Sequence, residues 1–277
     1  MWKSKTAPIL VSLAVIFQFL GCLSIEPTYT KEKIVEHITT LCQQEYKVEP
    51  KVWLLGETVL IYIPLPRLIT KEVKWDKDTM EKINKVMMGA CRVLLSMKPR
   101  PKFMELIASD TKEYGIDYSI ITWIPDIVKY QLQFISRDEF SRRNVIKIKE
   151  NSKALSDAEG NHIEKKEIVL EDFLAEQISQ RIYLKFGPDS PLKDYFKVKG
   201  VVAKFDQDTF AIQADIEEIK EPPKVHYNIQ KEIAKIVAYV VKEYEFKDFL
   251  LVDIDNTATG EESVFSRLAL KDFLRKE

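Results

Sequence analysis

The chain of 277 residues carries 42 Lys and Arg against 43 Asp and Glu, so its formal net charge is −1. Because these charges nearly cancel, no overall positive field favours binding to nucleic acid or to an anionic membrane surface. The chain also has only three His and three Cys, and none of them shows the paired spacing of a zinc site. The composition therefore predicts no nucleic-acid partner, no metal and no cofactor.

The first 22 residues have the layout of an export signal. Lys3 and Lys5 give a basic start, an apolar run covers about residues 7–20, and Gly21-Cys22 follows. The sequence Phe-Leu-Gly-Cys at residues 19–22 resembles the lipobox of bacterial lipoproteins, in which the Cys is lipidated and becomes the mature N-terminus.

This resemblance covers residues 1–22 only, and it implies that Cys22 carries the lipid of an exported protein that faces the periplasm. Several acyl chains on one Cys anchor a protein in the cell envelope without a spanning helix. Leu23 stands where an Asp retains lipoproteins at the inner membrane, which favours the outer membrane. Because Phe19 and Leu20 depart from the family pattern, an ordinary cleaved signal and an uncleaved anchor helix stay open as alternatives. All three place the rest of the chain outside the cytoplasm.

Four times along the remaining chain, an apolar stripe at helical spacing is followed by two short apolar stretches with a turn between them. The stripes predict helices over residues 33–44, 80–96, 169–183 and 229–244, each followed by an antiparallel strand pair. Gly115 and Gly260 stand at matching places in the second and fourth of these patterns. Helix followed by hairpin is also a common order, so recurrence without a structural repeat stays open.

The pattern predicts tandem αββ modules and an α+β fold. The modules are expected at residues 23–75, 76–139, 168–221 and 222–277, after the signal peptide of residues 1–22. Residues 140–167 are expected to form an inserted polar hairpin. Because each helix has one apolar stripe and each hairpin one apolar face, amphipathic helices must cover antiparallel hairpins or a sheet.

Cys42 and Cys91 both fall on apolar helical stripes, where a free Cys behaves as a small hydrophobic side chain. If Cys22 carries the lipid, they form the one possible disulfide pair of the chain. An oxidising periplasm would permit this bond. The apolar setting favours buried thiols, and the disulfide stays open because sequence does not show whether the two helices touch there.

Five basic residues cluster in the inserted region and give one possible anion-binding patch, for a lipid headgroup or a glycan. They are Arg137, Arg142, Arg143, Lys147 and Lys149. Asp138, Glu139 and Glu150 stand among them, which favours a solvated, salt-bridged surface over a binding site.

Residues 249–260 read FLLVDIDNTATG, which resembles the opening motif of the haloacid-dehalogenase-like phosphatases. The resemblance implies that Asp253 attacks phosphorus, that Asp255 transfers protons, and that both carboxylates help to hold magnesium. Only 20 residues follow Thr257, too few for the parallel sheet that carries the other catalytic groups of that family.

A structural interpretation accounts for the same residues. Asp253 and Asp255 lie two positions apart, on one solvent face of a strand, and residues 256–260 form the following turn. This interpretation predicts exposed carboxylates, with no Lys and no second acidic pair gathered around Asp253, and no enzymatic activity.

The function expected from the sequence is that of a membrane-anchored envelope lipoprotein that binds or scaffolds another envelope component, by strand addition or through module junctions. The expected partners are the membrane, through the N-terminal lipid, and a protein of the envelope. Two alternatives stay open: a metal-dependent phosphohydrolase that uses Asp253 and Asp255, and a carrier of an apolar ligand between the helix and sheet layers.

Overall fold

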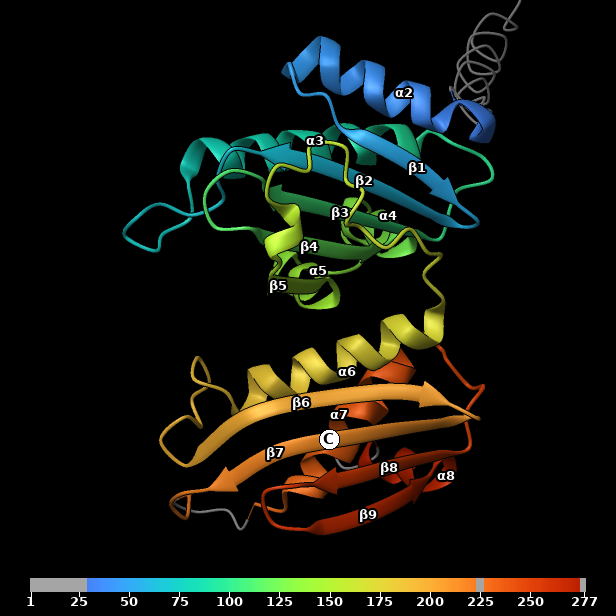
Figure 1. Cartoon of the computed structure of the whole chain (residues 1–277). Helices are drawn as coiled ribbons and strands as arrows, with labels where there is room; N and C mark the ends of the chain where they lie inside the picture. The colour runs from blue at the N-terminus through green and yellow to red at the C-terminus, as the bar shows by residue number, and fades with distance from the viewer. Residues whose placement is uncertain (1–28, 223–226, 275–277) are drawn as a thin grey trace, which may run out of the picture.

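The computed structural model describes residues 29–222 and 227–274, so the signal-like segment with Cys22 lies outside the described residues. The chain forms two units, which we define as residues 29–169 and 170–274, and each unit contains one sheet (Figure 1). Among the described residues, no helix combines the length and the apolar character that crossing a membrane requires.

The first unit begins with a helix that packs on a hairpin. Its elements are the 3-10 turn Lys31–Lys33, α2 (Ile34–Leu41) with a π turn Cys42–Tyr46, β1 (Lys51–Leu55), β2 (Thr58–Leu65), α3 (Lys77–Leu95), β3 (Phe103–Asp110), β4 (Ile116–Trp123), α4 (Ile124–Gln131), α5 (Arg137–Arg143), β5 (Val145–Glu150) and the 3-10 turn Ser152–Ala154. Asp76 caps α3, because its carboxylate accepts a hydrogen bond of 2.9 Å from the backbone N–H of Thr79.

The second unit repeats the helix–hairpin order. Its elements are α6 (Leu170–Phe186), β6 (Phe196–Asp206), β7 (Thr209–Glu218), α7 (Ile229–Glu243), β8 (Leu251–Asn256), β9 (Glu261–Ser266) and α8 (Arg267–Phe273). Asn228 caps α7 through a hydrogen bond of 2.8 Å from the N–H of Lys231.

The α+β prediction with αββ modules is confirmed. The strand orders are β1-β2-β3-β4-β5 and β6-β7-β8-β9. Each predicted hairpin is antiparallel, and within each unit the two hairpins join through one parallel pair, β2 with β3 and β7 with β8. The parallel pair follows from the connection, since α3 and α7 carry the chain back to the start of the sheet before the next strand.

The two units correspond residue by residue along their parallel strand pairs. The pair begins at Thr58 and Phe103 in the first unit and at Thr209 and Leu251 in the second. In the following hairpin, Gly115 has a φ of 62° and Gly260 a φ of 71°, a conformation that glycine adopts without steric cost. A short helix, α4 or α8, follows directly in both units.

The predicted polar hairpin of residues 140–167 is wrong. The strand in this segment is β5, in which apolar and basic residues alternate. It pairs with β4 and extends the first sheet, and it does not pair with another strand of its own segment. Residues 151–169, which we name the cover segment, then cross the face of this sheet that α2 and α3 leave free. The polar side chains that suggested a solvent-exposed turn partly find buried partners there, as described below.

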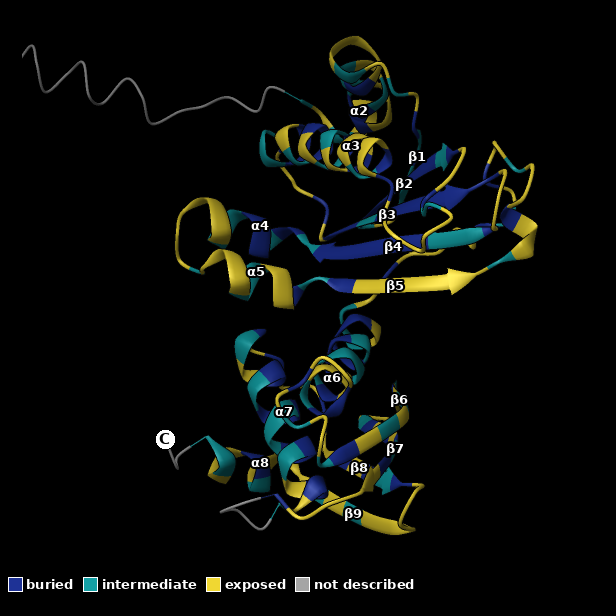
Figure 2. Cartoon of the chain, turned by 90° about the vertical axis from the view of Figure 1, so that its left-hand side faces the viewer, coloured by how far each residue is buried: buried dark blue, intermediate teal, exposed yellow. Residues whose placement is uncertain are grey.

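The cores follow from these layers. In the first unit α2 and α3 bury the side chains of β2 and β3 that point toward them, and in the second unit α6 and α7 bury one face of β7 and β8 (Figure 2). Phe103 of the first sheet packs against Phe173 of α6, with ring centroids 5.3 Å apart. One hydrophobic cluster therefore contains residues of both units.

Helix α6 lies between the facing edges of the two sheets (Figure 1). Gln180 accepts a hydrogen bond of 2.8 Å from the backbone N–H of Ile146 on β5. The neighbouring Ser179 accepts one of 2.7 Å from the N–H of Ala203 on β6. Two consecutive residues of one helix thus satisfy backbone donors of both sheets.

Candidate functional site

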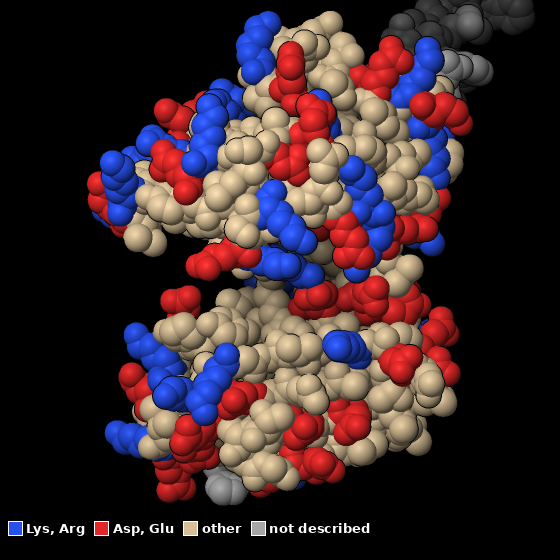
Figure 3. Space-filling model, viewed as in Figure 1, with Lys and Arg blue, Asp and Glu red and all other residues tan. Residues whose placement is uncertain are grey.

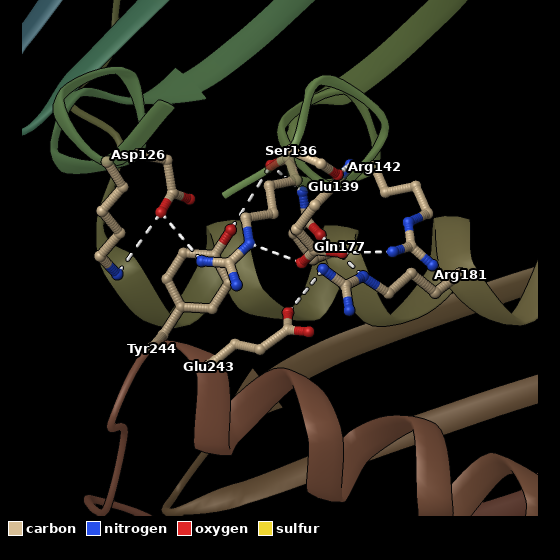
Figure 4. Close-up of polar contacts among 10 residues, drawn as sticks. Asp126, Ser136, Glu139, Arg142, Gln177, Arg181, Glu243 and Tyr244 are labelled. Atoms are coloured by element: carbon tan, nitrogen blue, oxygen red, sulfur yellow. Dashed lines mark hydrogen bonds and ion pairs between the residues drawn. The ribbon is translucent and has the colours of Figure 1, made fainter. Parts of the chain in front are cut away.

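Two groups of charged side chains meet at the junction of the two units, at the level of α6 (Figure 4). Gln177 of α6 connects them, because it donates a hydrogen bond to the carbonyl of Arg143 and accepts one of 3.2 Å from Arg181. The guanidinium of Arg143, a residue only 8% exposed, lies 3.0 Å from Asp126 and 2.7 Å from Glu139. Burial pushes the pKa of Glu139 upward, but the hydrogen bond and charge of Arg143 outweigh it and leave that pKa below its usual value. Arg181 of α6 pairs with Glu243 of α7 at 2.7 Å. These groups face inward and hold elements together.

The five basic residues predicted as a possible anion-binding patch do not form one. Arg143 is buried in the network just described, Arg142 pairs with Glu139, and Lys147 pairs with Glu176 of α6 at 2.6 Å. Arg137 and Lys149 remain exposed, one on α5 and one on β5. The interspersed carboxylates, with Asp126 and Glu176 from elsewhere in the chain, neutralise the cluster.

Cys42 and Cys91 are free thiols. Cys42 is buried and Cys91 half-buried, on helices that pack against each other. Burial, with a smaller contribution from the charge of Glu45, raises the pKa of Cys42 to about 11, and burial raises that of Cys91 to about 12. Thiols of this kind are poor nucleophiles at neutral pH.

A buried polar cluster lies under the cover segment, and no motif or spacing in the sequence indicates it. The ring of His162 places Nδ1 2.6 Å from Asp157 and Nε2 3.2 Å from Asp117. Ser109 donates a hydrogen bond of 2.5 Å to Asp117, and its Oγ lies 3.4 Å from Nε2 of His162. Tyr62 donates a hydrogen bond of 2.5 Å to the carbonyl of Asp157.

Ser109, His162 and Asp157 have the order of a nucleophilic triad, but their surroundings do not suit catalysis. Ser109 is fully buried and the His162 side chain is 2% exposed. The hydroxyl of Ser109 points to Asp117, so its proton is directed away from the imidazole. Burial raises the pKa of Tyr62 to about 12, although a hydrogen bond with Ser109 opposes the shift. The cluster fastens the cover segment to the sheet.

Within residues 29–222 and 227–274, no segment covers the second sheet in this way, and one face of it is exposed. We name as the open face Val202 and Lys204 of β6, Ala211 and Gln213 of β7, Asp253 and Asp255 of β8, and Glu262 and Val264 of β9. Seven of these residues line a hollow of about 360 Å³ together with Ile212, and Val264 is 61% exposed beside it. Acidic side chains lie over β8 and β9 in the lower half of Figure 3.

Asp253 and Asp255 occupy this face as the alternation predicted, with Asp253 exposed and Asp255 half-buried. Lys204 lines the same hollow from β6, two strands away from Asp253. Lys204, Ala211 and Asp253 are in register on three neighbouring strands, so roughly 10 Å separate the outer two backbones.

The catalytic geometry that the Asp-x-Asp motif implied is not assembled by the described residues. Strand β8 lies between a parallel and an antiparallel neighbour, and the described chain contains no group of three His, Cys, Asp or Glu side chains placed to hold a metal ion. Glu262, directly opposite Asp255 in the β8–β9 register, is the further carboxylate at the hollow.

A carrier would need an apolar space between helix and sheet layers. One hollow with apolar lining residues lies beside α7 and α8. It has a volume of about 470 Å³ and opens to solvent. Val241, Phe246, Phe249 and Leu270 form its floor, and all four are already buried. The space is therefore a surface depression.

Comparisons of the chain with protein-family models, with curated proteins and with solved structures found no match.

Proposed function

We propose that this protein is a non-enzymatic binding module of the cell envelope, which is anchored by a lipid on Cys22 and binds a partner protein through the open face of its second sheet. One observation carries this proposal. The same face of the first sheet is covered by the chain itself, whereas the open face presents a hollow and two exposed valines, Val202 at 51% and Val264 at 61%. The hydrogen-bonded strands of the sheet hold these side chains on one face, which suits recognition.

Binding through the face agrees better with the structure than strand addition at the inner edges. The edges of β5 and β6 both face α6, and Gln180 and Ser179 already satisfy backbone donors there. An added strand would have to displace the helix. Binding to the open face requires no rearrangement of the sheet. Exposed apolar side chains surrounded by charged ones are typical of transient interfaces.

Site-specific photo-crosslinking in the native envelope tests the binding face. A photoreactive residue in place of Gln213, which is exposed and lines the hollow, should yield an adduct of defined mass with another protein. The matched control is Met88 on α3, which is 54% exposed and should yield none. Equal adducts at both positions, or an adduct at Met88 alone, would contradict the proposed face.

The anchor is tested separately. Cys22→Ser should release the protein from the membrane or leave its precursor uncleaved, because the acyl chains supply the membrane affinity. Mass spectrometry of the mature N-terminus should show an acylated Cys22. An unmodified N-terminus at another residue would refute the anchor and leave the binding face untouched.

A phosphatase assay distinguishes binding from catalysis. The purified protein should not hydrolyse a generic phosphomonoester in the presence of magnesium. Turnover that disappears in Asp253→Asn would overturn the proposal and restore the catalytic meaning of the motif.

A further inference from the structure

The cover segment of the first unit shows how an extended chain occupies this kind of sheet face. Ile163 packs with Leu60, Tyr62 and Ile107 in one small hydrophobic cluster. Gly160 lies so close to Tyr62 that an added Cβ would come within 2.8 Å of the ring. The backbone of the segment therefore rests directly on the strands.

Polar contacts fix the segment on the same face. Ile168 donates its N–H to the hydroxyl of Thr58 at 2.9 Å. Burial, the largest influence, raises the pKa of Glu105, while the charges of Lys147 and Lys166 lower it in part. Lys166 of the cover segment pairs with Glu164 at 3.8 Å, and its charge also acts on Glu105, which the sheet half-buries.

The strand register shows which residues of the second sheet correspond to the residues that the cover segment contacts. Glu105 stands opposite Leu60 in the first parallel pair, and Asp253 stands opposite Ala211 at the same step of the second. By the same count Ile107 corresponds to Asp255, and Tyr62 to Gln213. The hollow of the open face therefore lies where the cover segment lies in the first unit.

The side chains at these positions determine which side chains a ligand of the open face must have. Leu60 and Ile107 contact an isoleucine, but their counterparts are the small Ala211 and the charged Asp255. An apolar side chain would bury a carboxylate there without a partner, which is unfavourable. A Lys or Arg side chain would reach into the hollow and pair with the carboxylate.

The carboxylates of the open face have no such partner within the described chain. Asp255 lies directly opposite Glu262, and like charges at this position destabilise a sheet. In the described ranges, no ion pair engages Asp253, Asp255 or Glu262, although Lys51, Lys147 and Lys185 each pair with an acid elsewhere.

We propose that the open face binds an extended segment of a partner protein that crosses the sheet as the cover segment crosses the first, with Lys or Arg side chains over Asp253 and Asp255. This inference rests on the function proposed above and names the chemistry of its partner. The face and the cover segment are two versions of one arrangement, with the ligand in cis in the first unit and in trans in the second.

A peptide built from the chain itself tests the inference. The probe is residues 160–169 with Ile163→Lys, labelled with a neutral dye, so that one Lys meets Asp255 and Lys166 meets Asp253. Fluorescence polarisation with the full chain in detergent at low salt should show saturable binding. The control peptide carries Ile163→Glu and Lys166→Glu and should not bind.

Matched protein variants separate the face from overall charge. The double variant Asp253→Asn and Asp255→Asn should weaken probe binding roughly tenfold, the loss expected for two partly exposed ion pairs. Asp138→Asn with Glu150→Gln removes the same charge from exposed positions of the first unit and should leave binding unchanged. Equal weakening by both variants, or no saturable binding, would overturn the inference.

Failure of this inference can be distinguished from failure of the proposed function. A protein adduct at Gln213 without binding of the probe would keep the binding face and refute a basic extended ligand. Sedimentation that shows a dimer, dissociated by Asp253→Lys, would replace the proposed partner with a second copy of this chain. Saturable probe binding without any adduct at Gln213 would support the recognition chemistry and contradict its use in the envelope.

Discussion

In the first unit, β2 and β3 are buried along nearly their whole length, whereas β7 and β8 alternate between buried and exposed positions (Figure 2). The αββαββ order and the parallel register are the same, and the first unit adds α5 and β5. The difference lies in the second face of each sheet, which the cover segment occupies in one unit and which is open in the other. One architecture thus supports a closed and an exposed sheet, and the side chains at alternate positions determine which is stable.

Removing the buried cation at the junction should have the largest effect. Arg143→Met leaves Asp126 and Glu139 with only Lys129 and Arg142, which are more exposed than Arg143, as ion-pair partners. We expect a loss of about 3 kcal/mol in the free energy of unfolding. Urea denaturation gives this value, with Arg142→Met as the control. The control should lower the free energy of unfolding by less than about 1 kcal/mol, because Arg142 is exposed. Similar losses in both variants would show that the buried position of Arg143 does not matter for stability.

Detaching the cover segment should make the first unit resemble the second. His162→Ala leaves Asp117 and Asp157 without the ring between them, at a cost of about 2–3 kcal/mol. Amide hydrogen exchange should accelerate in the cover segment and leave β7 and β8 unchanged. His37→Ala, on the half-buried surface of α2, is the control. Unchanged exchange in the cover segment would show that the cluster does not fasten it.

The acid dependence of stability should differ between the two faces. The pKa of Asp157 lies below the ordinary 3.8. Burial alone would raise this pKa, but the hydrogen bonds and charge of His162 lower it by more. Ionised Asp157 therefore stabilises the fold above that ordinary value, and this contribution of about 1 kcal/mol is lost as the pH falls toward the lowered pKa. Urea midpoints between pH 7 and pH 3 should fall less in Asp157→Asn than in the unchanged protein. Parallel curves would contradict this.

The smallest effects come from the two corresponding carboxylates. Burial raises the pKa of Glu105, so its charge opposes folding at neutral pH. Glu105→Gln should stabilise the protein by about 0.5–1 kcal/mol at pH 7, and the gain should vanish below the ordinary value of 4.5, where the carboxyl is protonated in both states. Asp253→Asn on the open face should stay within about 0.5 kcal/mol. A larger change at Asp253 than at Glu105 would reverse the comparison.

The helices and hairpins were predictable because they depend on local spacing. Ile83, Val86 and Ala90 recur at helical intervals and are all buried in α3, and the alternation around Asp253 and Asp255 gave their face correctly. The parallel pairing of β2 with β3 was not predictable, since an apolar stripe shows which face is buried but not which strand lies beside it.

The polar contacts escaped prediction for a different reason. His162 meets Asp117 from 45 positions away, and Arg143 meets Asp126 from a separate helix. A polar segment such as residues 151–169 has the composition of an exposed loop. Its burial depends on partners that only the folded chain brings together, so composition alone assigned it to solvent.

The position of α6 bears on how the protein avoids aggregation. Unpaired strand edges are the usual templates for uncontrolled growth of sheets between molecules. Here the edges of β5 and β6 face the same helix, where Gln180 and Ser179 occupy backbone donors of each. The sheets can therefore neither merge into one continuous sheet nor offer these two edges to a neighbouring chain.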